Sequence, residues 1–291
     1  MPYRARAIRL AVVALLAIVY GRAEVAARTD TQVWHVTVAL RIGDGHGRPV
    51  EVHVALPPET PAQRVSDVRI VDRGLKTQTI QGEEPEVVLS GIVRKSRRVA
   101  VSYTVAISAE EKTVPLIEPP EDPPLELYTE MSPAPLFPSR SILVREFLEE
   151  NVGPVLAEGN RGVMRAIYNV MRRRFEHKTD GKSLPLDVLR RGHGQRIGLE
   201  RLFTTFLRCA RIPARFIEGA KLDSRTKRKR VFWTEVWADG EWWPVSVSRG
   251  WIGKRSNDLL ALTYDGRRPV QVEGEATVTY TLQAHRRRGE Q

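Results

Sequence analysis

Apolar residues alternate with polar ones in three stretches of the N-terminal third of the chain. They run from Trp34 to Ile42, from Val50 to Leu56 and from Val99 to Ile107. A period of two residues predicts strands with one buried and one solvated face. The glycine-rich segment 43–47 separates the first two stretches, which predicts that they pair as a hairpin with a longer loop. We therefore expect a β-sandwich over residues 28–112.

A proline-rich stretch follows the predicted sandwich. Eight prolines occur between residues 113 and 138: Pro115, Pro119, Pro120, Pro123, Pro124, Pro133, Pro135 and Pro138. Proline has no amide donor, so this density disfavours a helix or a central strand. We interpret residues 113–138 as a linker between two domains.

Beyond the linker the apolar period becomes helical. Apolar stripes with helical spacing lie at residues 142–148, 163–175 and 199–210. Strand-like stretches come next, at residues 214–220, 231–237 and 242–247, with a tight turn predicted at Asp239-Gly240. These patterns predict a domain over residues 139–255 that combines helices with an antiparallel sheet, and hence an α+β fold class.

The C-terminal segment 256–291 ends in a basic tail. It alternates again between Val270 and Leu282, which predicts one further strand. Because a single strand does not fold alone, we expect it to add to one of the two predicted sheets.

The first 27 residues have the layout of a secretory signal. Three arginines (Arg4, Arg6 and Arg9) precede an apolar run from Leu10 to Tyr20, and no acidic residue occurs before Glu24. This run is shorter than the roughly 20 residues that a membrane-spanning helix needs. Small residues favour cleavage after Ala23 or Ala27. We expect a periplasmic or secreted protein, with an uncleaved membrane anchor as the alternative.

The net charge and the single cysteine indicate which partners are favoured and which covalent cross-links are excluded. The chain has 46 Lys and Arg against 35 Asp and Glu, a formal net charge of +11, which favours anionic partners. Export argues against nucleic acid. The lone cysteine, Cys209, excludes an internal disulfide, and its position on the apolar stripe of its helix predicts a buried thiol.

Three sequence segments carry a family resemblance. Arg-Ile-Pro-Ala-Arg-Phe at 211–216, Phe-Trp-Thr-Glu-Val-Trp at 232–237 and Glu-Trp-Trp-Pro-Val at 241–245 resemble motifs of the transglutaminase-like superfamily, over about residues 140–252. The resemblance implies a papain-like helix-plus-sheet domain. In active members a cysteine at a helix start, a histidine on a strand and an aspartate on the next strand form the catalytic triad. Arg211 departs from the family pattern, which has glycine there.

The resemblance places Arg196, Val231 and Ser246 at the three catalytic positions. None of these side chains can take its role, and no Cys, Ser or Thr occurs in 189–203, nor any His in 224–237. We therefore expect a non-catalytic protein, similar to the inactive transglutaminase-like proteins of bacterial envelopes that are often fused to seven membrane helices. One alternative is a cysteine-type peptidase or acyl transferase with relocated catalytic residues. Another is a structural module that presents its sandwich to a partner.

The resemblance implies an association with ATP-grasp peptide ligases and aspartyl-type peptidases, so a peptide-modifying enzyme or a membrane protein is an expected partner. The expected ligand is a peptide or an acidic envelope component. Arg196 should begin the helix 196–210 and bind an anion together with free amide groups. In a competing account Arg196 pairs with Glu235 across the former catalytic cleft. His193 lies near the same helix start, although an ordinary polar loop residue is the simpler interpretation.

Two further features leave alternatives open. Five tryptophans, Trp233 and Trp243 among them, crowd the last predicted sheet and fit either a binding groove or a filled core. The basic run 227–230 is a solvated loop or an attractant for an anion.

Two histidines are the only hint of a metal. His35 and His53 lie on the polar faces of two strands expected to be adjacent. Two histidines without a third ligand do not define a metal site. We therefore predict neither a metal nor a cofactor.

Overall fold

The computed structural model describes residues 30–287, apart from residues 44, 72–73, 83, 113–123, 125, 128–133, 157–158 and 224–228. The predicted signal segment, most of the linker and the first half of the basic run 227–230 lie outside the described residues. No helix within the described residues is long and apolar enough to cross a membrane. The described residues from Thr31 onward group into one compact unit by their contacts.

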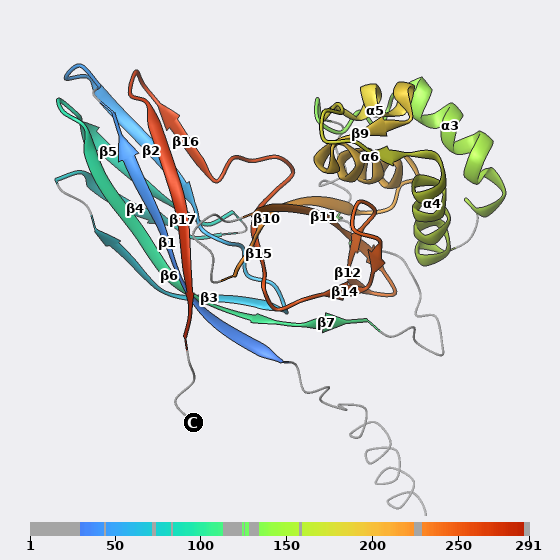
Figure 1. The fold of residues 1–291 in the computed structure, drawn as a ribbon, viewed down its shortest axis with the longest axis horizontal. Coiled ribbons are helices and arrows are strands. Elements are labelled where there is room, and N and C mark those ends of the chain that lie inside the picture. Colours follow the sequence, from blue (N-terminus) through green and yellow to red (C-terminus); the bar gives the residue numbers. More distant parts are fainter. Residues whose placement is uncertain are drawn as a thin grey trace, which may run out of the picture. The chain divides into compact units, whose positions relative to one another are not determined.

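Two four-stranded antiparallel sheets enclose the first apolar core (Figure 1). The first sheet has the order β17-β1-β6-β3, with β17 (Val278–Arg286), β1 (Thr31–Ile42), β6 (Arg97–Ser108) and β3 (Gln63–Val71). The second has the order β16-β2-β5-β4, with β16 (Val270–Glu273), β2 (Pro49–Ala55), β5 (Glu86–Ile92) and β4 (Lys76–Ile80). The apolar positions of the alternating stretches point inward and are buried, as the period of two predicts.

The predicted hairpin between the first two strands is wrong. β1 pairs with β6 and β17, whereas β2 pairs with β5 and β16, so consecutive strands of the chain belong to different sheets. An alternating strand can bury its apolar face equally well in either arrangement, and the pattern therefore does not select the partner. His35 and His53 consequently lie in different sheets and not on adjacent strands.

The C-terminal segment supplies two strands where the sequence predicted one. β17 pairs with β1 along its whole length, from Trp34↔Arg286 to Ile42↔Val278. β16 pairs with β2 in the other sheet. Each sandwich sheet is therefore completed by a strand from the far end of the chain.

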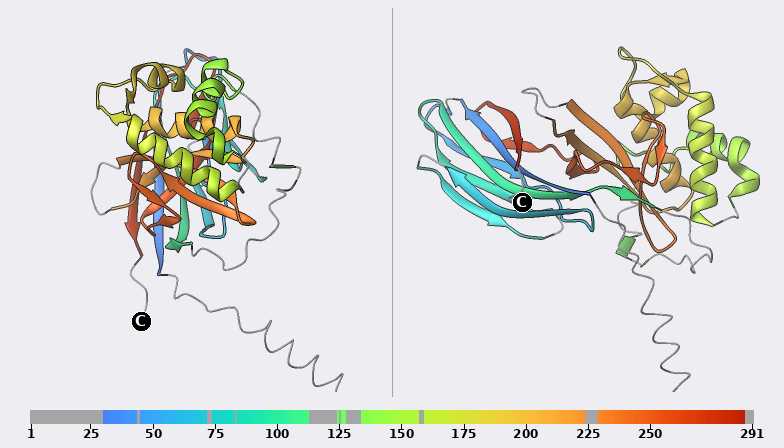
Figure 2. Two further views of the ribbon diagram at one scale, coloured as in Figure 1. Left: turned by 90° about the vertical axis from the view of Figure 1, so that its right-hand side faces the viewer. Right: turned by 60° about the horizontal axis from the view of Figure 1, so that its bottom comes forward.

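Helices and a five-stranded antiparallel sheet build the second core, which confirms the α+β fold class. The helices are α3 (Ile142–Val152), the short η1 (Gly153–Val155), α4 (Asn160–Arg174), α5 (Pro185–Arg191) and α6 (Arg196–Cys209). The sheet has the order β13-β12-β11-β10-β15, with β13 (Trp251–Ile252), β12 (Glu241–Ser246), β11 (Lys229–Ala238), β10 (Ala214–Lys221) and β15 (Leu259–Tyr264). Figure 2 shows these helices gathered beside the five-stranded sheet.

Two short strand pairs complete the fold. β8 (Glu176–His177) pairs in parallel with β9 (His193–Gly194) next to the helices. β7 (Glu110–Glu111) follows β6 directly in the chain and pairs with β14 (Lys254–Arg255). This pairing connects the end of β6 to the part of the chain that forms the second core.

Helix α6 packs against the centre of this sheet. Its predicted apolar stripe is buried, and the hydroxyl groups of Thr204 and Thr234 on β11 lie 2.9 Å apart in a hydrogen bond. The turn at Asp239-Gly240 is confirmed, with φ angles of 54° and 77°. Immediately after α6, Arg211 adopts the left-handed conformation with φ 61°, a geometry that favours glycine.

Candidate functional site

The start of α6 carries an exposed cation. Arg196 is the first residue of the helix, as predicted, and its side chain reaches solvent. Gln195 precedes it and makes no side-chain capping bond. The first backbone amides of a helix lack intrahelical acceptors and favour an anion. This helix start therefore combines amide donors with a permanent positive charge.

A buried acid lies one turn into the same helix. Glu200 is 0% exposed. Its carboxyl group accepts hydrogen bonds from the Ser246 hydroxyl at 2.6 Å, the Ser248 amide at 2.9 Å and the Val247 amide at 3.4 Å. Burial raises the pKa of Glu200 to about 7, even though these hydrogen bonds act to lower it. The sequence patterns did not predict a role for Glu200. The one local indication is that an acidic residue occurs within an apolar helical stripe.

Two further cationic side chains, Arg172 and Arg249, lie near the segment that binds Glu200. On α4, Arg172 donates to the Val247 carbonyl oxygen at 3.1 Å. Burial lowers the pKa of Arg249 below its usual value, and the charge of Arg196 lowers it further. Within the described residues, no carboxylate lies at ion-pair distance from Arg196 or Arg249. Arg196 and Arg249 thus form no ion pair within the described residues, although the charges of Glu200 and Asp258 act to raise the pKa of Arg249.

Two of the three positions that the resemblance assigns to a triad lie at or next to the first turns of α6. Arg196 opens α6, and Ser246 is hydrogen-bonded to Glu200 on the next turn of that helix. Val231 is different, because it packs with Ile217 and Trp233 in a separate apolar cluster. Thr234, of opposite strand parity, is the β11 residue that contacts α6. The histidine position predicted from the motif therefore points away from the helix.

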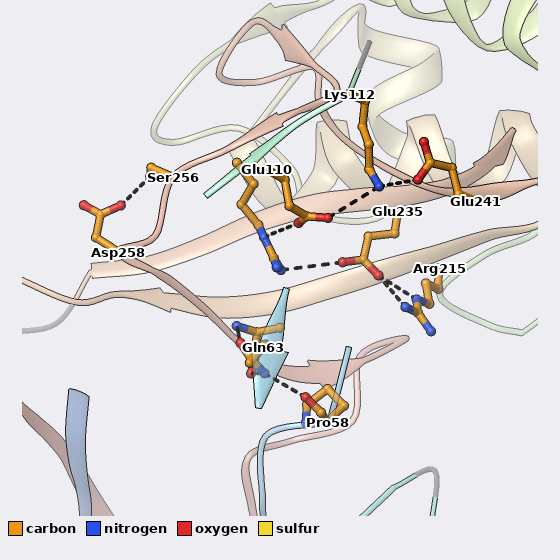
Figure 3. Close-up of polar contacts among 11 residues, drawn as sticks. Pro58, Gln63, Glu110, Lys112, Arg215, Glu235, Glu241, Ser256 and Asp258 are labelled. Atoms are coloured by element: carbon orange, nitrogen blue, oxygen red, sulfur yellow. Dashed lines mark hydrogen bonds and ion pairs between the residues drawn. The ribbon is translucent and has the colours of Figure 1, made fainter. Parts of the chain in front are cut away.

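Glu235 shares the face of Val231 and does not meet Arg196. Its carboxylate accepts from the Arg215 guanidinium at 2.6 and 2.7 Å (Figure 3). Arg255 of β14 lies 3.8 Å from its other oxygen. The competing account of an Arg196–Glu235 pair is therefore wrong.

This ion-pair network is largely buried and reaches the strand that continues from β6. The Arg255 side chain is 1% exposed and lies 2.7 Å from the Glu110 carboxylate of β7. Lys112 connects Glu110 to Glu241 of β12 (Figure 3). Burial raises the pKa of Glu110, although Arg255 acts against the rise. We interpret this network as structural, because its charges are paired with one another.

Trp233 and Trp243 are 0% and 3% exposed. They belong to the apolar cores on the two faces of the five-stranded sheet. Of the two alternatives for these tryptophans, the structure favours the filled core. His193, in β9, is half-buried, and its Nδ1 atom has no hydrogen-bond partner within the described residues.

Cys209 is the last residue of α6, at the opposite end from Arg196. At 1.5 Å per residue, the two lie about 20 Å apart along the helix. The thiol is half-buried rather than fully buried, and burial raises its pKa. The single cysteine is thus neither at the helix start nor activated.

Comparisons with known proteins agree with this fold. Residues 154–247 match the family model of the transglutaminase-like superfamily, which confirms the resemblance of the motifs. A crystal structure of a "Putative Cysteine Protease" from Cytophaga hutchinsonii aligns over 90% of this chain and 93% of that one, with a TM-score of 0.67 and 13% identity. A "putative protease" from Parabacteroides distasonis aligns over 73% and 43%, with a TM-score of 0.32 and 12% identity. No curated protein matches the chain in sequence. At 13% identity, the first likeness establishes a shared fold.

Proposed function

We propose that the chain, whose residues 154–247 match the transglutaminase-like superfamily, is a non-catalytic binding or accessory protein of the bacterial cell envelope. The observation that carries the proposal is the residue at the start of α6. The motif resemblance assigns Arg196, the first residue of α6, to the position where an active member has its cysteine. A guanidinium group stays protonated and is not a nucleophile. The helix start is thus suited to holding an anion and not to attacking a carbonyl.

Relocation of the nucleophile is the alternative. Ser246 is the hydroxyl nearest to an acid in this region, but both Ser246 and Glu200 are 0% exposed, so a substrate has no access to them. Cys209 lies at the far end of α6 with a raised pKa, whereas catalytic thiols have lowered pKa values. Neither group meets the requirement for an accessible nucleophile with a nearby base.

The proposed ligand is an anionic group, such as a peptide carboxylate or an acidic envelope component. Arg196 and Arg249 offer two guanidinium groups near one helix start, and the net charge of +11 favours anions at longer range. A charge-assisted hydrogen bond to such a group contributes about 1.5 to 3 kcal/mol. The basic run 227–230 adds further positive charge, and its described residues Lys229 and Arg230 are exposed.

The envelope location and the partners are also part of this proposal. The Arg-rich start and apolar run within residues 1–27 favour export to the periplasm or beyond. In that compartment, a peptide-modifying enzyme or a membrane protein is the partner class that the family resemblance suggests. Nucleic acid is not an expected partner.

Binding of a fluorescent acidic peptide to the purified chain tests the ligand class. We expect saturable binding that an uncharged analogue of the same length does not reproduce. Arg196→Ala and Arg249→Ala should each weaken it roughly tenfold or more, the equivalent of one charge-assisted bond. Arg145→Ala is the matched control, because it removes one exposed positive charge near the Cys209 end of α6. Equal losses in all three variants, or none in the first two, would contradict the proposed site.

A further inference from the structure

A histidine on the outer face of the second sandwich sheet is surrounded by acids from three strands. His53 and Glu51 lie on β2, Glu86 on β5 and Glu273 on β16. Glu51 and Glu273 are direct cross-strand partners. Like charges placed opposite one another destabilise a sheet unless a cation lies between them. This arrangement therefore calls for a positive charge at one point on the sheet.

The distances between the side-chain atoms fit a small divalent cation. His53 Nε2 lies 3.0 Å from a Glu51 oxygen and 3.9 Å from a Glu273 oxygen. One ligand atom from each of these residues lies within 4.8 Å of the others. Ligands about 2.0 to 2.1 Å from a tetrahedral zinc ion are separated from one another by about 3.3 Å. The two observed distances bracket this separation, so small side-chain rotations suffice to form the site.

The other ring nitrogen has the partner that a metal-binding histidine needs. His53 Nδ1 lies 3.3 Å from a Glu86 oxygen. Glu86 is in turn held by Arg267. A carboxylate at Nδ1 fixes the ring orientation and leaves the lone pair of Nε2 for a metal. His53 Nε2 is a buried atom that makes no well-aligned hydrogen bond within the described residues, although the Glu51 oxygen lies 3.0 Å away.

We propose that Glu51, His53 and Glu273 form a binding site for Zn²⁺, with Glu86 as the positioning residue that orients the imidazole. An imidazole ligand favours zinc over Ca²⁺ and Mg²⁺, which take oxygen ligands. Three protein ligands leave a fourth position for water. The ion would tie β16, from the C-terminal segment, to β2 of the same sheet. Its effect is therefore on the attachment of that segment to the sandwich.

The competing account is that these side chains bind no metal ion, as is common for exposed acidic groups. Zinc titration of the tag-free, chelator-treated full chain separates the two accounts. We expect calorimetry to show one equivalent bound, and thermal unfolding to shift upward with zinc but not with Ca²⁺. His53→Ala should abolish both effects. Glu86→Gln should weaken zinc binding roughly 10- to 100-fold, as loss of a carboxylate behind a ligating histidine does.

A matched pair of surface variants keeps the test independent of folding. The Glu273 side chain is 76% exposed, so Glu273→Gln leaves the core intact and should weaken zinc binding at least tenfold. Glu275→Gln removes the same charge two residues further on, where the glutamate pairs with Arg48, and should leave binding unchanged.

Three results would overturn the proposal. One is the absence of saturable binding near one equivalent. Another is equal binding in Glu273→Gln and Glu275→Gln. The third is zinc binding that survives His53→Ala and is lost in His35→Ala, which would assign the ion to the cross-strand pair of His35 and His285.

Discussion

The Ser246 hydroxyl group donates a 2.6 Å hydrogen bond to the Glu200 carboxyl group, and neither side chain is exposed to solvent. This bond joins β12 to α6 next to the helix start that Arg196 occupies. In active relatives of this fold, a catalytic aspartate is expected on the strand and a cysteine on the helix. In this chain the same two elements are joined by a hydrogen bond between a buried serine and a buried glutamate.

Glu200 should make the stability of the chain depend on pH. Its pKa of about 7 in the folded protein lies above the ordinary value of 4.5, so the folded state holds a proton that the unfolded state releases. The contribution of Glu200 to the free energy of unfolding should therefore be largest below pH 4.5. It should fall by about 3 kcal/mol as the pH rises through 7.

Chemical denaturation of the wild type and of Glu200→Gln across this pH range measures the contribution. Glutamine keeps an oxygen acceptor but cannot ionise, so the stability difference between the two proteins should change with pH. Glu176→Gln changes an exposed acid and serves as the control. A constant difference between the wild type and Glu200→Gln from pH 4.5 to 8 would show that Glu200 does not hold the extra proton.

Arg215 should be important for stability and not for ligand binding. Its guanidinium group lies 4.2 Å from the Trp242 ring centre and 4.4 Å from that of Tyr264, and it holds the buried Glu235. Arg215→Ala should lower the free energy of unfolding, measured by urea denaturation, by about 3 kcal/mol, because the buried Glu235 carboxylate loses its closest cation. Lys254→Ala breaks a pair with Glu111 whose side chains are 66% and 68% exposed, and it should cost less than about 1 kcal/mol. Similar costs for the two variants would refute the structural role of this network.

Arg211 should carry a conformational cost. It adopts φ 61° after α6, a conformation that a side chain disfavours and glycine accepts. Arg211→Gly should therefore raise the free energy of unfolding by about 1 kcal/mol. Gly192 follows α5 with φ 70°, so Gly192→Ala should lower the free energy of unfolding. If Arg211→Gly instead lowers the unfolding temperature in a thermal scan, contacts of the arginine side chain stabilise the fold by more than its backbone conformation costs.

Cys209 should react slowly with thiol reagents. Its sulfur is half-buried, and its raised pKa leaves little thiolate near neutral pH. Alkylation at pH 7 should be at least about tenfold slower in the native chain than in the same chain unfolded in urea, where the thiol has its ordinary pKa. Equal rates in the two states, followed by mass spectrometry, would indicate an accessible thiol.

Local patterns predicted the elements of this protein better than their pairing. The period of two in 34–42 and the helical stripe in 199–210 identified a strand and α6 because one buried face dominates each sequence. One partner of β1 is β17, which lies more than 200 residues further along the chain. No local sequence pattern predicts a pairing over that separation. The same pattern could not distinguish a hairpin from a crossing between two facing sheets.

The site was predictable only in part, for similar reasons. The motif placed Arg196 at the helix start and Ser246 beside that helix, as the structure has them. It could not show that Val231 faces the other side of the sheet, because an aligned motif does not report side-chain direction. Glu200 was missed because its hydrogen-bond partner, Ser246, lies 46 residues further along the chain.

The most direct test of the central claim is a turnover assay on the purified chain with peptide and amine substrates, run beside Cys209→Ser. The account predicts that neither protein hydrolyses or transamidates peptides above the buffer blank, because no thiol lies at the start of α6. Turnover by the wild type that disappears in Cys209→Ser would contradict the account and assign the chain a cysteine-dependent activity.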